Sequence, residues 1–292
     1  MKSLFYLLCL FIFHHQLIAQ QDWEKHMKIF DARTAEEVGM SDLVAAMADA
    51  DVLFFGEEHD DSIAHRVQAT LYEGLMDTYT DVILSMEMFE RDAQLVLDEY
   101  LADHITETKL KEEGKAWSNY SDYAPMVNLA KSQGQQVVAA NVPSRYANMV
   151  ARKGLTALNA LSKESKKYLP SLPVFTDQPL YGEKFDTALG GQGHGMGPAI
   201  FHAQLLRDAT MAESIYNTWR KNKKSKILHL NGRFHSDEYL GTVAALQRLR
   251  KKLVMVTVSC FSSEDFEKPD WDAYNGLGDF IILTDPNVSR SF

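Results

Sequence analysis

The sequence predicts an α/β fold, a three-layer α/β/α arrangement with a mostly parallel sheet and a helical cap insertion. Short apolar runs rich in β-branched and aromatic residues occur at residues 52–55, 82–86, 137–140, 227–230, 254–258 and 280–283. Such runs are typical of strands buried on both faces, and their alternation with helical patterns indicates a parallel sheet covered by helices. The stretches 104–123 and 154–222 exceed ordinary connections, so we expect them to form the cap.

The helices are predicted from apolar side chains that recur every three to four residues. Residues 62–78 show this most clearly, with Asp60 or Asp61 as the expected N-cap. A shorter helix over 41–49 would be capped by Ser41, and residues 20–40 are expected to form a loosely structured lead-in. Further helices are predicted at about 92–102, 125–132, 143–152, 199–221 and 237–251.

The N-terminus is interpreted as a signal peptide over residues 1–19. Lys2 supplies a positive charge, an apolar run follows over residues 3–13, and a small-residue cleavage site ends at Ala19. We therefore expect a protein exported across a bacterial inner membrane, periplasmic or membrane-associated, with residues 20–292 forming a single domain. No transmembrane segment is expected in the mature chain. Its one cysteine, Cys260, follows an apolar run and is expected to be a buried small hydrophobe.

The charge balance argues against one broad class of function. The chain has 292 residues, 46% of them hydrophobic, and a net charge of −10 without a long basic run. A dedicated nucleic-acid-binding protein needs a basic surface to neutralise phosphates, so we exclude that class. The length is ample for one large core, and the negative charge is most simply a matter of solubility.

Two turns of the same form follow buried strands at distant points of the chain. Gly56 and His59 frame the first Gly-x-x-His turn, which also carries Glu57, and Gly232 and His235 frame the second. Other polar side chains end neighbouring strands, namely Glu87, Asn141 and Asn231. Because ligands of parallel sheets bind at the carboxyl ends of the strands, we predict that these groups share one site. The alternative is that each is a turn residue or a hydrogen-bonded core histidine.

These residue types suit two kinds of chemistry. His59, Glu87 and His235 have the ligand types for a divalent metal such as zinc, manganese or iron. Without metal, the histidines and Glu57 or Glu87 could perform acid–base catalysis, with Asn231 or backbone amides stabilising an oxyanion. Neither histidine belongs to a local metal-binding motif, so both alternatives depend on the fold.

A glycine-rich segment at residues 190–198 offers a different kind of ligand. It contains His194 and Met196, and both side chains are known axial ligands of haem iron, as is tyrosine. No Lys-Ser or Lys-Thr follows, so the segment is not a phosphate-binding loop. The alternative is an exposed lid in which His194 and Met196 are incidental.

Five segments together resemble the ChaN-like haem-binding proteins, a family related to erythromycin esterase and the Tiki proteases. They are the Gly56–His59 turn, the strand that ends in Glu87, the turn at Asn141, the helical AQLLRDATMAESI at 203–215, and HLNGRFHSD at 229–237. The resemblance covers roughly residues 45–285. It implies the α/β/α fold with helical additions and an exported, iron-regulated protein that binds haem between the subunits of a homodimer.

Site residues follow from the resemblance position by position. Glu57, His59, Glu87, Asn141, Asn231 and His235 match the pocket motifs of the family, and Arg207, Asp208, Met211 and Ala212 match its motif on the long helix. A tyrosine ligand of haem is implied, for which Tyr181 is the candidate beside His194. The haem propionates would need cations, and Arg145, Arg207 and Arg233 are the candidates.

The sequence therefore supports two hypotheses. The first is a haem-binding protein of iron uptake or storage, with cofactor contacts from His59, Asn141, Arg145, Tyr181, His194, Arg207, Asn231 and His235. The second is a hydrolase of esters or peptides that uses Glu57, His59, Glu87 and His235, with or without a divalent metal, as the esterase and Tiki relatives imply. A purely structural interaction domain is disfavoured, because such domains rarely place so many ionisable groups behind buried strands.

Overall fold

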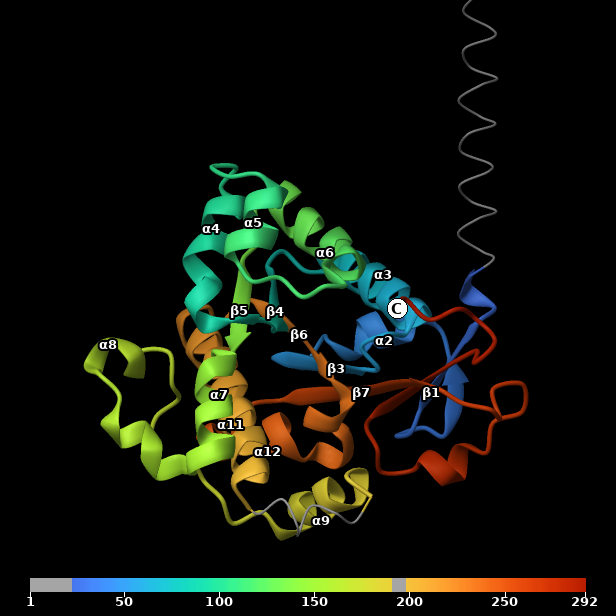
Figure 1. Ribbon diagram of the computed structural model, residues 1–292. Coiled ribbons are helices and arrows are strands. Elements are labelled where there is room, and N and C mark those ends of the chain that lie inside the picture. Colours follow the sequence, from blue (N-terminus) through green and yellow to red (C-terminus); the bar gives the residue numbers. More distant parts are fainter. Residues whose placement is uncertain (1–22, 191–197) are drawn as a thin grey trace, which may run out of the picture.

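One eight-stranded sheet forms the centre of the molecule (Figure 1), in a computed structural model that describes residues 23–190 and 198–292. The order of strands across the sheet is β2-β1-β8-β7-β3-β6-β4-β5. The six strands from β3 to β8 are parallel to one another, and β1 pairs antiparallel with β8 and with β2. The bounds are β1 Met27–Asp31, β2 Glu36–Val38, β3 Val52–Glu57, β4 Val82–Glu90, β5 Val137–Asn141, β6 Lys226–Gly232, β7 Met255–Ser262 and β8 Phe280–Thr284.

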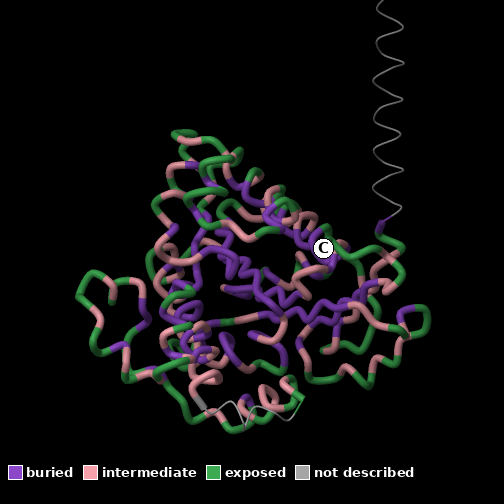
Figure 2. The backbone as a smooth tube through the Cα atoms, in the orientation of Figure 1, coloured by how far each residue is buried: buried purple, intermediate pink, exposed green. Residues whose placement is uncertain are grey.

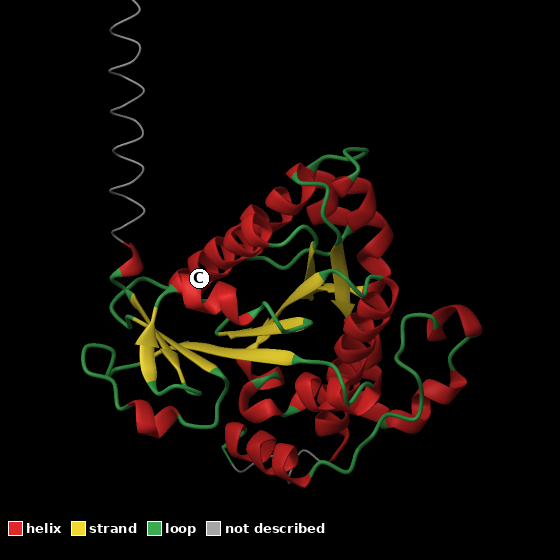
Figure 3. Cartoon of the chain, turned by 180° about the vertical axis from the view of Figure 1, so that it is seen from behind, coloured by secondary structure: helices red, strands yellow, loops and turns green. Residues whose placement is uncertain are grey.

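Helices cover both faces of this sheet (Figure 3). The main helices are α2 Met40–Ala46, α3 Ser62–Thr78, α4 Gln94–Leu101, α5 Glu107–Glu113, α6 Tyr120–Ser132, α7 Ser144–Lys153, α8 Lys163–Lys166, α9 Pro179–Ala188, α11 Pro198–Lys221 and α12 Gly241–Leu249. Short 3-10 turns include η1 Arg91–Ala93, η2 Leu155–Ala160, η3 Arg233–His235, η4 Asp237–Tyr239 and η5 Trp271–Tyr274.

The alternation of side chains along β3 divides the core between the two faces. Leu53 and Phe55 pack with helices α2 to α6 in the largest apolar cluster. Val52 and Phe54 belong to a second cluster, together with Ile215 of α11 and helix α12. Because successive residues of a strand point to opposite faces, a fully buried strand must be covered on both, which gives three layers. Figure 2 shows the buried backbone concentrated in the sheet and the helix faces against it.

The predicted fold class is confirmed, and each of the six predicted strands is present. The sequence did not predict β1 and β2, since residues 20–40 were expected to lack regular structure. The burial along β1 explains this, because only Ile29 and Asp31 of its five residues are buried. A strand in which few side chains are buried leaves a weak apolar pattern, and β1 is held instead by its pairing with β8 and β2.

The expected cap differs from the structure because parts of both predicted segments belong to the core. Helix α11, which lies within the predicted 154–222 insertion, packs directly on the sheet through Ala212 and Ile215 and therefore belongs to a layer of the core. Likewise, α5 and the start of α6, in the predicted 104–123 segment, join the main cluster through Leu110 and Tyr120. The segments with α8 and α9 lie at the periphery (Figure 1).

Helix ends show which capping predictions were correct. The side chain of Asp61 accepts hydrogen bonds from the backbone of Ile63 and Ala64 and caps α3, whose bounds match the prediction. Helix α2, in contrast, begins after Gly39 and not after Ser41. The predicted signal peptide lies outside the described residues. In the two described ranges, no helix is both long and apolar enough to span a lipid bilayer.

Candidate functional site: two histidine turns beside Glu87

The two Gly-x-x-His turns lie side by side because their strands are neighbours in the sheet. Strands β3 and β6 run parallel, with Gly56 opposite Asn231 and Glu57 opposite Gly232. A Cβ atom on Gly232 would lie only 2.7 Å from Nε2 of His59. The imidazole of His59 in the first turn therefore contacts the backbone of the second turn at Gly232. Only glycine at position 232 leaves room for this ring.

The second histidine is held between two carboxylates. Nδ1 of His235 lies 2.7 Å from Oδ1 of Asp208, and its Nε2 lies 3.3 Å from Oε1 of Glu87. Burial alone would lower the pKa of His235, but Glu87 and Asp208 outweigh it and raise the pKa to about 10. His235 is therefore an imidazolium at neutral pH, and both ring nitrogens act as donors.

Glu87 connects the two turns. Its Oε2 accepts a hydrogen bond of 2.7 Å from the backbone N–H of Gly232, while Oε1 faces His235. Burial would raise the pKa of Glu87, yet the charges of His235 and His59 lower it well below its usual range. A buried, ionised carboxylate thus lies between two imidazoles, a position that local sequence cannot specify.

His59 is oriented from behind by Glu57. Nδ1 of His59 lies 2.8 Å from Oε1 of Glu57, and this oxygen also accepts a bond of 2.5 Å from the Tyr123 hydroxyl. The amide of Gln68 donates to the other oxygen of Glu57. Burial opposes ionisation of Glu57, but its hydrogen bonds to His59 and His65 lower the pKa. This arrangement fixes Nδ1 of His59 as the donor, while Nε2 faces the backbone of Gly232.

His59 is also the more exposed of the two imidazoles. Its side chain is 36% exposed, against 8% for that of His235. The ring meets Trp117 edge to face, and Asn119 donates to the backbone oxygen of His59. Burial lowers the pKa of His59, but Glu57 and Glu87 reverse this and raise it. A ligand from solvent would therefore meet His59 first.

A third group of polar side chains supports His235 from α11, α9 and α12. Oδ1 of Asp208 accepts from the Thr242 hydroxyl as well as facing His235. Nε2 of Gln204 lies 3.2 Å from Nδ1 of His235, where two donors meet and form no hydrogen bond, and it donates to the hydroxyl of Tyr181. The family resemblance pointed to Asp208, but Gln204, Thr242, Tyr123 and Gln68 were missed. Each is an ordinary helical residue whose role appears only when the helices pack.

Several predicted site residues are engaged elsewhere. Asn141 accepts from the backbone of Val142, and its strand β5 is separated from β6 by β4. Asn231 donates to the Gly232 carbonyl and the Ser236 hydroxyl, so it holds its own turn.

The remaining cofactor candidates occupy varied positions. Arg145 pairs with Asp92 near the surface. Tyr181 is fully buried, and burial together with Asp208 raises its pKa. A phenol ligates haem iron as phenolate, so this tyrosine would have to leave its network to serve. Arg207 is half-buried on α11 beside Asp208, and His194 lies outside the described residues.

The predicted metal site finds no support in the described part of the chain. No group of three or more histidine, cysteine, aspartate or glutamate side chains there is arranged to hold a metal ion. His235 explains this physically, because its two nitrogens donate to carboxylates and offer no lone pair. Cys260 is fully buried, as expected for a small hydrophobe, and burial raises the pKa of its thiol well above its ordinary value.

Comparison with known families identifies the family of the chain. A family model described as haem-binding uptake, Tiki superfamily, ChaN matches residues 43–246, which is more than half of the chain. The chain belongs to this family. The matched range contains both histidine turns, Glu87 and helix α11. A search of curated proteins found no match.

One solved structure supports the fold, and others are more distantly similar. A structure of ChaN of Campylobacter jejuni, described as showing cofacial heme binding, has a TM-score of 0.67 and 17% sequence identity, and the match covers 89% of this chain and 97% of that one. The type III effector HopBA1 has a TM-score of 0.47 and 13% identity, over 85% of this chain and 94% of that one. Erythromycin esterase EreC also has a TM-score of 0.47 and 13% sequence identity, and the match covers 84% of this chain and 78% of that one. At 17% identity the likeness to the Campylobacter jejuni structure concerns the fold alone.

Proposed function

We propose that this protein binds haem through His59 and acts in haem or iron uptake or storage. Membership of the haem-binding uptake family supports the ligand class, and ChaN of Campylobacter jejuni is itself described as binding haem cofacially. The observation that carries the assignment of His59 is its bond to the buried Glu57, which fixes the Nδ1 donor; Nε2 faces the backbone of Gly232 and becomes the ligating nitrogen once the ring moves off that glycine. Metal-binding histidines commonly donate their second nitrogen to a carboxylate in this way.

The other described histidine of the site fits haem iron less well. His235 is almost fully buried, and both nitrogens face carboxylates. Haem iron needs an axial ligand with a free lone pair, which an imidazolium lacks. When bound, haem would supply redox and oxygen-binding chemistry, whereas the chain supplies a partly exposed imidazole and the indole of Trp117 against it.

The test is a hemin titration of the chain followed by absorption spectroscopy. We expect a shifted Soret band that saturates at about one haem per chain or less. His59→Ala should remove the shift or weaken binding at least tenfold, and His104→Ala, at an exposed histidine, should leave it intact. An unchanged spectrum of the wild type with excess hemin contradicts haem binding, and an unchanged His59→Ala contradicts the assigned ligand.

Three further parts of the proposal concern the biology. The protein is exported after cleavage near residue 19, it forms a homodimer, and its production is iron-regulated. N-terminal mass analysis of the periplasmic fraction tests cleavage, light scattering with and without hemin tests the dimer, and protein levels under iron limitation test regulation. An uncleaved protein retained in the cytoplasm would contradict the first part.

A second candidate function is hydrolysis of an ester or peptide, which the two carboxylate-held imidazoles favour. His59, at the solvent side, can exchange a proton with a bound substrate. Glu57 keeps the ring of His59 in one tautomer. A screen of ester and peptide substrates tests this, and any activity that survives His59→Ala and His235→Ala unchanged argues against the site.

A further inference from the structure

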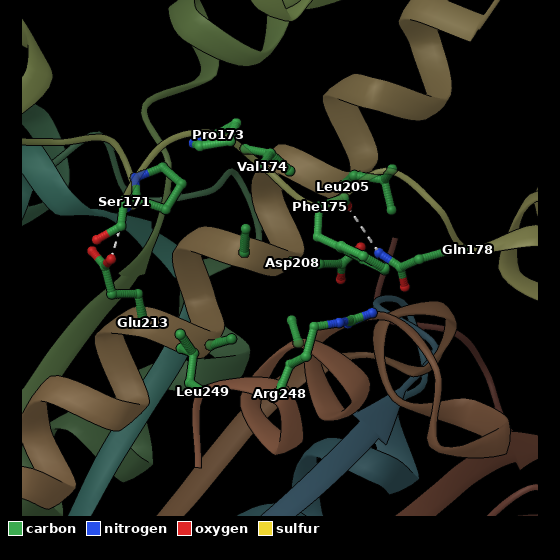
Figure 4. A pocket seen from close by; sticks show the side chains of 14 residues that line it. Ser171, Pro173, Val174, Phe175, Gln178, Leu205, Asp208, Glu213, Arg248 and Leu249 are labelled. Atoms are coloured by element: carbon green, nitrogen blue, oxygen red, sulfur yellow. Dashed lines mark hydrogen bonds between the residues drawn. The ribbon is translucent and has the colours of Figure 1, made fainter. Parts of the chain in front are cut away.

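A separate cavity lies behind the site, between residues 170–178 and helices α11 and α12 (Figure 4). Its volume is about 120 Å³, and its walls are mostly apolar, including Pro173, Val174, Leu205, Ala209, Ala245 and Leu249. An engineered protein cavity of about 150 Å³ holds benzene, so this space suits a small organic molecule of similar size. Phe175 and Leu249 at its edge are 48% and 43% exposed, which places the cavity in contact with solvent.

The inner wall of this cavity contains a buried carboxylate with an unused acceptor. Asp208 is 1% exposed and lines the cavity. Its Oδ1 is occupied by His235 and Thr242, whereas Oδ2 is buried without a hydrogen-bond partner among the described residues. The hydroxyl of Tyr181 lies close to Asp208, and its interaction with that carboxylate raises the pKa of Tyr181, but the geometry falls short of a hydrogen bond to Oδ2. A buried acceptor without a donor is unfavourable, so Oδ2 favours a ligand that brings one.

The outer wall contributes a cation without a matching carboxylate. The guanidinium of Arg248 stacks 3.9 Å from the ring centre of Phe175, and it donates weakly to the Ala244 carbonyl. Within residues 23–190 and 198–292, no acidic side chain forms an ion pair with it. In Figure 4 the side chains of Arg248, Gln178 and Asp208 converge on the same end of the cavity.

The second carboxylate of the lining is already engaged. Glu213 faces Arg91 through one oxygen and accepts from the backbone of Ser171 through the other. The groups of the cavity that remain open to a ligand are therefore the buried Oδ2 of Asp208 and, at the mouth, the solvent-exposed guanidinium of Arg248. A purely apolar ligand leaves both unmet, a simple anion is repelled by Asp208, and a simple cation leaves Arg248 unpaired.

We propose that this cavity binds a small zwitterion with an apolar body, of the class of apolar amino acids. Its ammonium donates to Oδ2 of Asp208, its carboxylate pairs with Arg248, and its hydrocarbon part packs on the apolar wall. The site is distinct from the proposed haem contact at His59, and it shares Asp208 with the network of His235. Binding there does not require haem or any hydrolytic activity.

The test is calorimetry of the purified chain with three matched compounds. L-leucine carries both charges, 4-methylpentanoate lacks the ammonium, and 3-methylbutylamine lacks the carboxylate. We expect leucine to bind at least tenfold more tightly than either analogue, since each charged hydrogen bond in a partly buried site contributes at least that factor. No heat with leucine at millimolar concentrations, or equal affinity for all three compounds, overturns the proposal.

Variants separate the cavity from other surfaces. Arg248→Gln should weaken leucine binding at least tenfold and leave binding of 3-methylbutylamine unchanged, whereas Lys251→Gln, a nearby exposed cation, is the matched control. Ala209→Leu and Ala245→Leu each fill the cavity and should abolish binding, with circular dichroism confirming that the variants fold. Full leucine affinity in Arg248→Gln, or in both folded filling variants, would refute the site.

Discussion

The charged His235 makes a prediction about how stability depends on pH. The pKa of His235 is raised from 6.5 to about 10 in the folded protein. A group with a raised folded-state pKa stabilises the protein fully below its unfolded pKa, and this contribution is lost as the pH rises through the folded pKa. We therefore expect the free energy of unfolding to fall between about pH 6.5 and about pH 10 because of this residue.

The magnitude follows from the shift. Each pKa unit corresponds to about 1.4 kcal/mol, so His235 contributes on the order of 5 kcal/mol well below pH 6.5 and on the order of 4 kcal/mol at pH 7. Glu87 and Asp208 both raise the pKa of His235. Asp208→Asn removes one of these two negative charges and keeps the shape of the side chain. The variant should lose about 2 kcal/mol of stability near pH 6 relative to the wild type, with the difference shrinking towards pH 10.

Urea unfolding of both proteins across this range measures the difference, and nitrogen-detected NMR of the imidazole reports the pKa of His235 directly. Asp177→Asn, at an exposed aspartate of the 170–178 segment, is the matched control and should leave the pH dependence unchanged. Parallel stability curves for wild type and Asp208→Asn, or an NMR titration of His235 near its ordinary value, would refute the reasoning.

Three further changes test the supports of the site. Gly232→Ala would place a methyl group 2.7 Å from Nε2 of His59 and should displace that ring. The variant should keep its fold but should no longer bind hemin in titrations. Tyr123→Phe removes a hydrogen bond to the buried Glu57 and should cost about 1–3 kcal/mol in urea unfolding. Arg91→Met removes bonds to three partners besides its ion pair and should destabilise by about 3–5 kcal/mol.

Controls for these variants come from the same chain. Gly182→Ala places a methyl group at 3.6 Å from Phe201, an ordinary contact, and should be tolerated in hemin titrations. Lys109→Met, at an exposed surface ion pair, should change stability by less than about 1 kcal/mol. Normal hemin binding by Gly232→Ala would show that the position of His59 is unimportant, and a neutral Arg91→Met would show that its buried bonds contribute little.

The sequence predicted the parts of the molecule that depend on short-range pattern. Continuous apolar runs such as Val52–Phe55 indicate strands buried on both faces, and the bounds of helix α3 follow from its apolar face and the Asp61 cap. The pair of Gly-x-x-His turns pointed to one shared location, because parallel strands end at the same edge of a sheet.

Other features could not be predicted because they depend on contacts between distant segments. Strand β1 pairs with β8 some 250 residues away, and its own burial pattern is weak. Helix α11 was assigned to a cap, and the apolar residues that place it on the sheet could equally have packed within a separate insertion. The cavity lined by Asp208 and Arg248 arises only where α11, α12 and the 170–178 segment meet.

The sequence by itself thus determined which elements form and which polar residues end the strands, because backbone propensity and apolar periodicity are local properties. Only the tertiary structure decided the chemistry. The order of strands places β3 beside β6, which brings His59 onto Gly232, and the packing of α11 and α6 brings Asp208 to His235 and Tyr123 to Glu57. The charges of these imidazoles depend on carboxylates that are distant in sequence and near only in the folded chain.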